Sequence, residues 1–329
     1  MVPPTILPVD PAHPDPAAIA RAAGVIRRGG LVAFPTETVY GLGADALDAA
    51  AVERIFQAKE RPGYNPLIVH VPDAEAARAL TRVWPEAATR LAERFWPGPL
   101  TLVLPKRPAV PDRVTAGLDS VALRVPAHPV ALALLRAAER PIAAPSANRF
   151  TQLSPTTAQH VAKGLDGRVE LILDGGPTTV GIESTVVDLT GPRPAVLRPG
   201  ILGRDALAAV IGALDTPDVV RADEAPRRGP GMLDRHYSPR ATVRLFDPGA
   251  GTPPLPPDAV SGALLLRAPD PGVDHPVVLP ADPEGYAREL YAALHRLDDL
   301  GCALVLVERP PDGPAWAGVR DRLERAARA

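Results

Sequence analysis

The sequence predicts an α/β protein with two unequal domains. Short apolar runs, typical of strands covered on both faces, alternate with segments of helical periodicity over residues 1–214. A stretch rich in proline, glycine and charge follows at residues 215–240, and a shorter strand–helix alternation occupies residues 241–329. A chain of 329 residues also exceeds what a single core usually organises. We therefore expect a larger N-terminal domain, a linker and a smaller C-terminal α/β domain.

Capping residues mark where several helices of the N-terminal domain begin. Asp15 precedes Pro16 at a first helical turn, Asp48 caps the next helix, and Ser154 is expected to cap a later one. The remaining elements follow from apolar runs of strand length or from helical periodicity. In order, we expect a helix at 17–28, a strand at 31–35, a helix at 49–59, a strand at 66–71, helices at 73–80 and 85–95, strands at 100–104 and 121–125, a helix at 130–139, a strand at 141–148 that runs into a loop, a helix at 155–165, strands at 170–174, 184–189 and 195–199, and a helix at 202–214.

The sheet of the N-terminal domain is expected to be mixed. Residues 190–192, Thr-Gly-Pro, join two strands by a link too short for a crossover helix, so these strands form a hairpin. The C-terminal domain should contain strands at 242–246, 262–267 and 303–307, a long helix around 285–300 and a final helix.

Composition excludes several classes of protein. The net charge of −2 and the pI of about 6.4 argue against a protein that mainly neutralises nucleic-acid phosphates. The single cysteine, Cys302, allows neither an internal disulfide nor a cysteine-rich zinc site. The N-terminus lacks the basic start and apolar core of a signal peptide, and no segment has the length of a membrane span. We expect a soluble, cytoplasmic protein.

The segment FPTETVYGLG, residues 34–43, carries the strongest local signal. A short apolar strand ends in Thr36, Glu37 and Thr38, and Gly41 and Gly43 follow in what we interpret as a glycine turn. Open α/β sheets present polar groups at this edge to small molecules. A polar turn without a ligand explains the segment equally well.

Isolated cations suggest anion sites, but each has a structural alternative. Lys59 and Arg61, two residues apart, suit a polyphosphate. Cations are also favoured at an ordinary helix end, and this segment taken alone is better explained in that way. Arg124 lies within an apolar strand and needs an anion. That anion is either a protein carboxylate or a ligand carboxylate, and we prefer the ligand.

Small residues and hydroxyls cluster at further strand ends. They occur at residues 144–148 (APSAN) before Ser154, and at residues 174–188, with an arginine ending the strand at Arg198. Helix capping is the plain explanation for Ser154. Neither a Walker A loop nor a GxGxxG fingerprint, a Ser-His-Asp elbow or an HExxH motif occurs in the sequence. The histidines are scattered along the sequence, which argues against a metal held only by protein.

Taken together, these segments resemble the YrdC-like, threonylcarbamoyl-AMP synthase family in its longer, two-domain form. The matching strings appear in family order over about residues 20–240: FPTETVYGLG, KERPGYNPLIVH, FWPGPLTLVL, SVALRVP, APSANRFTQLSPT, DGGPTTVGIESTVVD, VLRPG and PGMLDRHYSP. The resemblance implies a YrdC-like twisted mixed sheet with flanking helices and a smaller C-terminal Rossmann-like domain. One departure is Thr151, where members often have glycine, so we expect that loop to differ in shape.

The resemblance also implies an activity. L-Threonine, bicarbonate or CO2, and ATP would give L-threonylcarbamoyladenylate and pyrophosphate, and a separate transferase would use the product to make N6-threonylcarbamoyladenosine in tRNA. Mg²⁺ would be carried on the phosphates, with no protein metal site. The linker would fold over the nucleotide as a lid.

Matching positions transfer the family's site residues to this chain. L-Threonine would be bound by Thr38, His70, Arg124, Ala144 and Ser184. ATP would be bound by Arg61, Asn65, Ser120, Ser146, Ser154, Arg198 and Tyr237. The catalytic Lys-x-Arg and Ser-x-Asn signature would be Lys59, Arg61, Ser146 and Asn148.

Two other functions compete with this interpretation. A domain of the same fold could serve as a tRNA- or double-stranded-RNA-binding module, but the overall acidity and the lack of interleaved basic and aromatic residues weigh against it. A hydrogenase maturation enzyme also contains a YrdC-like domain. Such proteins carry zinc-finger cysteines, and with Cys302 alone this chain cannot.

Overall fold

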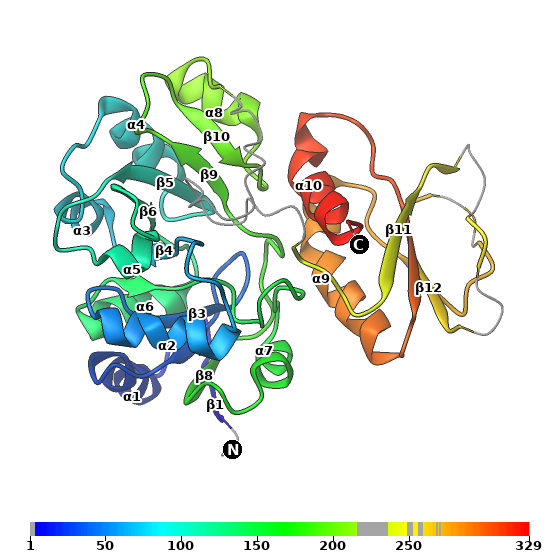
Figure 1. Cartoon of the computed structure of the whole chain (residues 1–329), viewed down its shortest axis with the longest axis horizontal. Helices are drawn as coiled ribbons and strands as arrows, with labels where there is room; N and C mark the ends of the chain where they lie inside the picture. Colours follow the sequence, from blue (N-terminus) through cyan, green and yellow to red (C-terminus); the bar gives the residue numbers. More distant parts are fainter. Residues whose placement is uncertain are drawn as a thin grey trace.

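A ten-stranded mixed sheet organises the larger part of the chain (Figure 1). The computed structural model describes residues 4–215, 236–248, 253–255, 259–267, 269 and 271–328. Neighbouring strands include parallel and antiparallel pairs, and the short link at residues 190–192 does join an antiparallel pair, as predicted. Across the sheet the strands are β1 Thr5–Pro8, β8 Leu171–Asp174, β2 Val32–Phe34, β3 Gly41–Asp45, β7 Ile142–Ala143, β4 Ile68–His70, β6 Ser120–Arg124, β5 Leu100–Pro105, β9 Thr185–Asp188 and β10 Ala195–Arg198.

Helices cover the two faces of this sheet unequally. Successive strand residues point to opposite faces, so Ile172 enters one core while its neighbours Leu171 and Leu173 enter the other. The first core is packed by α2 Ala49–Lys59, α3 Ala74–Ala79, α4 Glu86–Phe95, α5 Asp112–Thr115, α7 Ala158–Leu165 and α8 Arg204–Ile211. The second is packed by α1 Pro16–Arg27 and α6 Pro129–Ala138. These two helices cover only the β8–β2–β7 part of their face, and the β4–β6–β5–β9 part packs as a separate small cluster.

Two local expectations from the sequence are wrong. Gly41 and Gly43 do not form a turn: they belong to β3, which pairs antiparallel with β2. Neither has a positive φ, but a Cβ on Gly43 would lie 2.7 Å from both Ile142 and Phe34, so close packing requires glycine. Ser154 does not cap a helix, because α7 begins at Ala158 and Thr157 is its N-cap, accepting a hydrogen bond from the His160 N–H.

The second sheet is smaller and entirely parallel. Its order is β11 Thr242–Phe246, β14 Leu304–Glu308, β12 Ser261–Leu265 and β13 His275–Val278. The expected long helix is α9 Pro283–Asp299 and the final helix is α10 Ala317–Ala326. Strands β1 and β13 and the short α5 were not expected from the sequence. Of the expected linker, residues 216–235 lie outside the described residues. Within the described ranges, no helix is long and apolar enough to cross a membrane.

Helices α9 and α10 lie between the two sheets (Figure 1), and glycines mark where they meet the segments after β8 and β10. A Cβ on Gly181, which has a φ of +84°, would lie 2.3 Å from the carbonyl oxygen of Ala287 in α9. A Cβ on Gly318 in α10 would lie 2.6 Å from the carbonyl oxygen of Gly200. Backbone therefore packs against backbone where the two units meet.

This close approach predicts the effect of adding one methyl group. Gly318→Ala should lower the free energy of unfolding by about 1–3 kcal/mol, because the backbone of Gly200 cannot move aside as a side chain could. Gly164→Ala is the matched control, because Gly164 is also helical but a Cβ added there would meet no described atom within 4 Å beyond its own helical turns. This substitution should change stability by less than about 1 kcal/mol. Urea denaturation of both variants measures the difference. Equal stabilities would contradict the packing described here.

Candidate active site

A cavity of about 560 Å³, a figure that includes its open mouth, lies on the side of the large sheet that α1 and α6 leave partly uncovered. Strand register explains which side chains reach it. Ile68 and His70 of β4 lie opposite Ala122 and Arg124 of β6, and all four point to the same face. The cavity wall is completed by the β2–β3 connection, the loop after β7, the end of β10, and residues 236 and 237.

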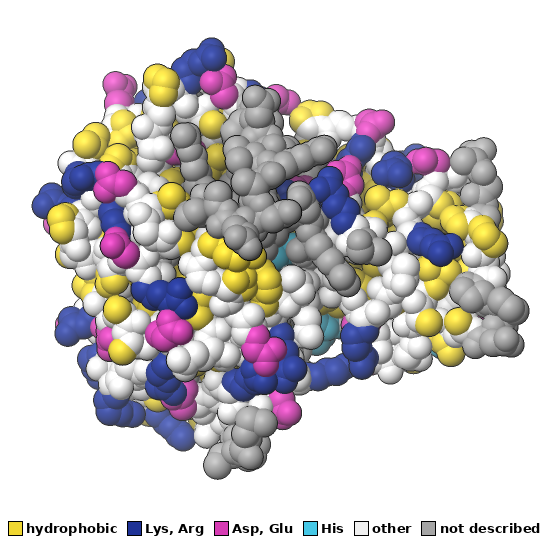
Figure 2. Space-filling model, in the orientation of Figure 1, with side chains coloured by type: hydrophobic (Ala, Val, Ile, Leu, Met, Phe, Trp, Pro, Cys, Tyr) yellow, Lys and Arg dark blue, Asp and Glu magenta, His cyan; other side chains and the backbone are white. Residues whose placement is uncertain are grey.

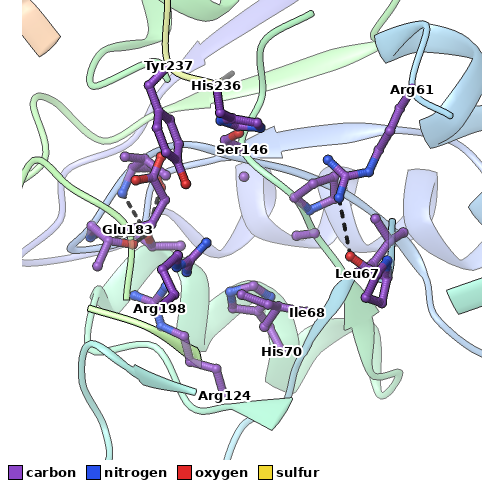
Figure 3. A pocket seen from close by; sticks show the side chains of 17 residues that line it. Arg61, Leu67, Ile68, His70, Arg124, Ser146, Glu183, Arg198, His236 and Tyr237 are labelled. Atoms are coloured by element: carbon purple, nitrogen blue, oxygen red, sulfur yellow. Dashed lines mark hydrogen bonds between the residues drawn. The ribbon is translucent and has the colours of Figure 1, made fainter. Parts of the chain in front are cut away.

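Eight of the fourteen site residues predicted from the sequence line this cavity. From the predicted threonine set they are Thr38, His70, Arg124 and Ala144. From the predicted nucleotide and catalytic sets they are Arg61, Ser146, Arg198 and Tyr237. Figure 3 shows the guanidinium groups of Arg61, Arg124 and Arg198 approaching the same space from different elements. The site is therefore a convergence of cations, which suits an anionic ligand.

Arg124 is paired with a protein carboxylate. Its Nη2 lies 2.8 Å from Oε1 of Glu37, and its Nε donates a hydrogen bond of 3.3 Å to the carbonyl of Gly98. Oε2 of Glu37 accepts a further hydrogen bond from the Ala127 N–H. The anion that this buried arginine needs is therefore a protein carboxylate, and not the ligand carboxylate that we expected from the sequence. Nη2 carries two N–H groups, and apart from Glu37 it has no partner among the described residues, so one N–H remains for a ligand.

His70 is held neutral beside Arg124. Burial, reinforced by the positive charge of Arg124, lowers the pKa of His70 to about 3. Its ring packs edge-on against Phe34 with the centroids 6.1 Å apart. His70 therefore lines the cavity without adding a second cation beside Arg124.

Lys59 supports the loop at residues 146–148 from behind and does not line the cavity. It is the last residue of α2, but its side chain turns inward, and Nζ donates to the carbonyls of Ser146 at 2.6 Å and Asn148 at 2.5 Å. Burial, together with the charge of Arg61, lowers the pKa of Lys59 well below its ordinary value. Asn148 is also buried, and its amide donates to the carbonyls of Arg149 and Gln152. The Lys-x-Arg and Ser-x-Asn segments are therefore in direct contact.

Arg61 reaches the cavity from the other side of this loop. Its Nη2 donates to the carbonyl of Pro66 at 3.3 Å, and its guanidinium lies 5.9 Å from the ring centroid of Phe150. Among the described residues, Nε of Arg61 has no partner, and neither polar atom of the buried Asn65 amide has one. Arg61 lines the cavity, whereas Asn65 is 1% exposed and does not.

Three predicted residues lie in the wall or beyond it. Ser184 Oγ contacts Thr101 Oγ1 at 2.7 Å, and Ser154 Oγ donates to Oε1 of Glu183 at 2.5 Å, so both are buried behind the surface of the cavity. Ser120 begins β6, at the opposite end of the strand from Arg124, and pairs with Pro105. The structure does not bring Ser120 to the cavity.

Tyr237 is buried over the cavity, and its hydroxyl has no hydrogen-bond partner among the described residues. The backbone of Tyr237 is left-handed, with a φ of 61°, which is unusual for a bulky residue. The N–H of the next residue, Ser238, donates a hydrogen bond to the carbonyl of Thr151. Thr151 is itself left-handed at φ 66°, so this chain adopts there a conformation that glycine favours. Figure 3 shows the Tyr237 ring above Glu183.

Sequence reasoning missed several residues of the site. Glu37, Glu183 and His236 were present inside matching strings but were assigned no role, and Arg322 lies outside every string. Burial lowers the pKa of His236 well below its ordinary value, which favours the neutral imidazole. For Glu183, burial alone would raise the pKa, but Arg322 and Arg198 outweigh it and lower the pKa to about 2. Among the described residues, no three His, Cys, Asp or Glu side chains group to hold a metal.

Comparison with known proteins identifies the class to which this fold and site belong. Residues 24–200 match the Sua5/YciO/YrdC family, described as telomere recombination, and residues 202–328 match the threonylcarbamoyl-AMP synthase C-terminal domain. The chain belongs to this family and is an enzyme of the threonylcarbamoyl-AMP synthase class, a nucleotidyltransferase. The predicted family and two-domain α/β fold are thereby confirmed.

Individual relatives match over nearly the whole chain. The threonylcarbamoyl-AMP synthase of Pyrococcus abyssi is 45% identical over 93% of this chain and 93% of its own length. That of Bacillus subtilis is 42% identical, over 94% of this chain and 92% of its own. A crystal structure of P. abyssi Sua5 complexed with L-threonine superposes with a TM-score of 0.89 at 43% identity, covering 98% of this chain and 97% of that one.

The neutral state of His70 predicts a pH dependence of stability. The unfolded chain binds a proton on His70 below a pKa of 6.5, whereas the folded protein does not until about pH 3, so stability falls as the pH falls below 6.5. His70→Gln should remove about 2 kcal/mol of the loss in unfolding free energy between pH 7.5 and pH 5. The control is His13→Gln, because the His13 side chain is 90% exposed. Parallel pH profiles for wild type and His70→Gln would show that His70 is not held neutral.

Proposed function

We propose that the chain makes L-threonylcarbamoyladenylate and pyrophosphate from L-threonine, bicarbonate or CO2, and ATP. The observation that carries this proposal is the single cavity in which Arg124, with its free donor, lies beside Arg61 and Arg198. One anion site fits an amino-acid carboxylate and the others fit a triphosphate. Membership of the family and the related structure with bound L-threonine support the same assignment.

The reaction needs positioning and charge neutralisation more than a protein nucleophile. The threonine nitrogen attacks the carbon of CO2 and loses a proton, which forms a carbamate. A carbamate oxygen then attacks the α-phosphorus as the bond to pyrophosphate breaks. The chain's contribution is to hold the two substrates in line and to stabilise charge on the departing pyrophosphate.

In this proposal Arg124 binds the threonine carboxylate. Glu37 holds the guanidinium from one side, with Oε1 2.8 Å from Nη2, and leaves the second N–H of Nη2 to the ligand. Thr38, Ala144 and the neutral His70 line the rest of that niche, and none of these three adds a charge that would repel the threonine ammonium. Ser184, which contacts Thr101, shapes the niche from behind.

ATP occupies the side of the cavity with Arg61 and Arg198. Ser146 offers a hydroxyl there, and Lys59 and Asn148 keep its loop in place. We keep Asn65 with the nucleotide because its amide has no partner among the described residues, although it does not line the cavity, and Ser154 acts only through Glu183. Magnesium enters as MgATP, as part of the substrate. Glu183, the carboxylate among the lining residues, is already engaged by protein donors on both oxygens.

Tyr237 closes the nucleotide side in this account. The residue is 1% exposed, and its hydroxyl points into the cavity without a partner among the described residues, so we assign it to the ligand. A closed cavity would keep water from the mixed anhydride until the product leaves. We place the reaction in the cytoplasm, where a tRNA threonylcarbamoyltransferase would take up the product for tRNA N6-threonylcarbamoyladenosine. Stable tRNA binding is not part of the proposal, and basic and acidic side chains are interspersed on the face shown in Figure 2.

Pyrophosphate release tests the function directly. Purified protein with MgATP, L-threonine and bicarbonate should release pyrophosphate, and omission of any one substrate should abolish the release. Mass spectrometry of the quenched reaction should detect threonylcarbamoyladenylate. Pyrophosphate release that does not require threonine would contradict the proposal, and a salt-dependent tRNA gel shift without this activity would favour the RNA-binding alternative.

Substitution of Arg124 separates the two substrates. Arg124→Lys keeps a charge opposite Glu37 but loses the planar fork that grips a carboxylate, so the KM for L-threonine should rise by at least about tenfold. The KM for ATP should change by less than about threefold, since Arg61 and Arg198 are intact. Initial rates of pyrophosphate release, with each substrate varied in turn, measure both constants. Equal losses for the two substrates would rule out the proposed carboxylate clamp.

A further inference from the structure

The carboxylate of Glu183 is held by both structural units. Its Oε1 accepts a hydrogen bond from Ser154 at 2.5 Å. Its Oε2 accepts one from the Tyr291 hydroxyl of α9 at 3.1 Å and one from Nε of Arg322 in α10 at 2.7 Å. All four side chains are buried, with Arg322 only 1% exposed. Two of the three donors therefore come from the second unit, although Glu183 itself lines the cavity.

Arg322 also binds two backbone carbonyls of the larger unit. Its Nη1 donates to the carbonyl of Pro199 at 2.9 Å, and its Nη2 donates to the backbone carbonyl of Glu183 at 3.3 Å. Its guanidinium lies 5.0 Å from the ring centroid of Tyr237. A single side chain from α10 thus joins the strand end after Arg198, the segment before β9 and the tyrosine over the cavity.

This arrangement decides which arginine neutralises Glu183. Arg198 lies close enough to Glu183 for the two charges to influence each other, yet its Nε and Nη2 donate to the Ser184 carbonyl at 3.1 and 2.9 Å. Arg322 forms the ion pair with Glu183 instead. Because a buried carboxylate needs a partner, Glu183 without Arg322 would attract Arg198 and cancel its charge.

We propose that Arg322 is a positioning residue for the nucleotide: by pairing with Glu183 it leaves the charge of Arg198 free for the ATP phosphates. This inference rests on the proposed function. It also gives the second unit a defined part in the site. Arg322 of α10 does not line the cavity, but it neutralises Glu183, which does. Arg322 acts through Glu183 and need not contact ATP.

Substitution of Arg322 tests the proposal by ATP binding. Isothermal titration of Arg322→Met with MgATP should give a Kd raised by at least about tenfold, and the KM for L-threonine should change by less than about twofold. In the double variant Glu183→Gln/Arg322→Met the unpaired carboxylate is gone, so the Kd for ATP should return to within about threefold of wild type. A purely structural role would leave the double variant at least as weak as the single one.

Matched variants make the outcome decisive. Arg320→Met removes an arginine from the same helix whose ion pairs, to Asp312 and Glu324, do not involve Glu183, and it should not change ATP affinity. If Arg322→Met does not fold, as shown by its thermal unfolding, the double variant and Arg322→Lys carry the test, and both should bind ATP within about threefold of wild type.

Two results would overturn the inference, and a third would overturn the function. An unchanged Kd for ATP in Arg322→Met would contradict the role of Arg322 but not the proposed function. So would a double variant that binds ATP no better than Arg322→Met. If Arg322→Met does not fold, a double variant at least about tenfold weaker than wild type would contradict that role. Wild-type protein that does not bind MgATP would contradict the proposed function, and this inference with it.

Discussion

The need to keep several positive charges buried around one cavity constrains the rest of the structure. Lys59, Arg124 and Arg198 are each less than 5% exposed, and such charges are costly unless each one is paired or hydrogen-bonded. Backbone carbonyls satisfy Lys59 and Arg198, and Glu37 pairs with Arg124. Each cation is thus held by its own partners: Arg124 and Arg198 line the cavity, and Lys59 supports its wall from behind.

The architecture provides these partners from segments far apart in the sequence. The period of the strands places His70 and Arg124 on one face, and the β2–β3 connection brings Glu37 over them. The second unit does more than pack beside the first. Its helices approach closely enough, at Gly181 and Gly200, for Tyr291 and Arg322 to reach Glu183 inside the wall. A parallel sheet of four strands holds those helices in place.

Local sequence signals predicted most of the elements, because helix starts and short buried strands depend on residues that are close together in the sequence. They did not distinguish the glycines of β3 from a turn, since the reason for Gly43 is contact with Ile142, about a hundred residues away. The same limit applies to the site. Arg124 was recognised because a charge stands out in an apolar strand, whereas the pairing of Glu183 with Arg322 spans 139 residues and has no local pattern. The roles of individual residues toward threonine and ATP came from resemblance and stay predictions.

A crystal structure with a non-hydrolysable ATP analogue and L-threonine would test the central claim most directly. The account predicts the threonine carboxylate on Arg124, the triphosphate against Arg61 and Arg198, and the Tyr237 hydroxyl within hydrogen-bond distance of the nucleotide. It also predicts that Glu183 remains paired with Arg322 when the phosphates are bound. A nucleotide seated outside this cavity, or a threonine carboxylate that does not contact Arg124, would contradict it.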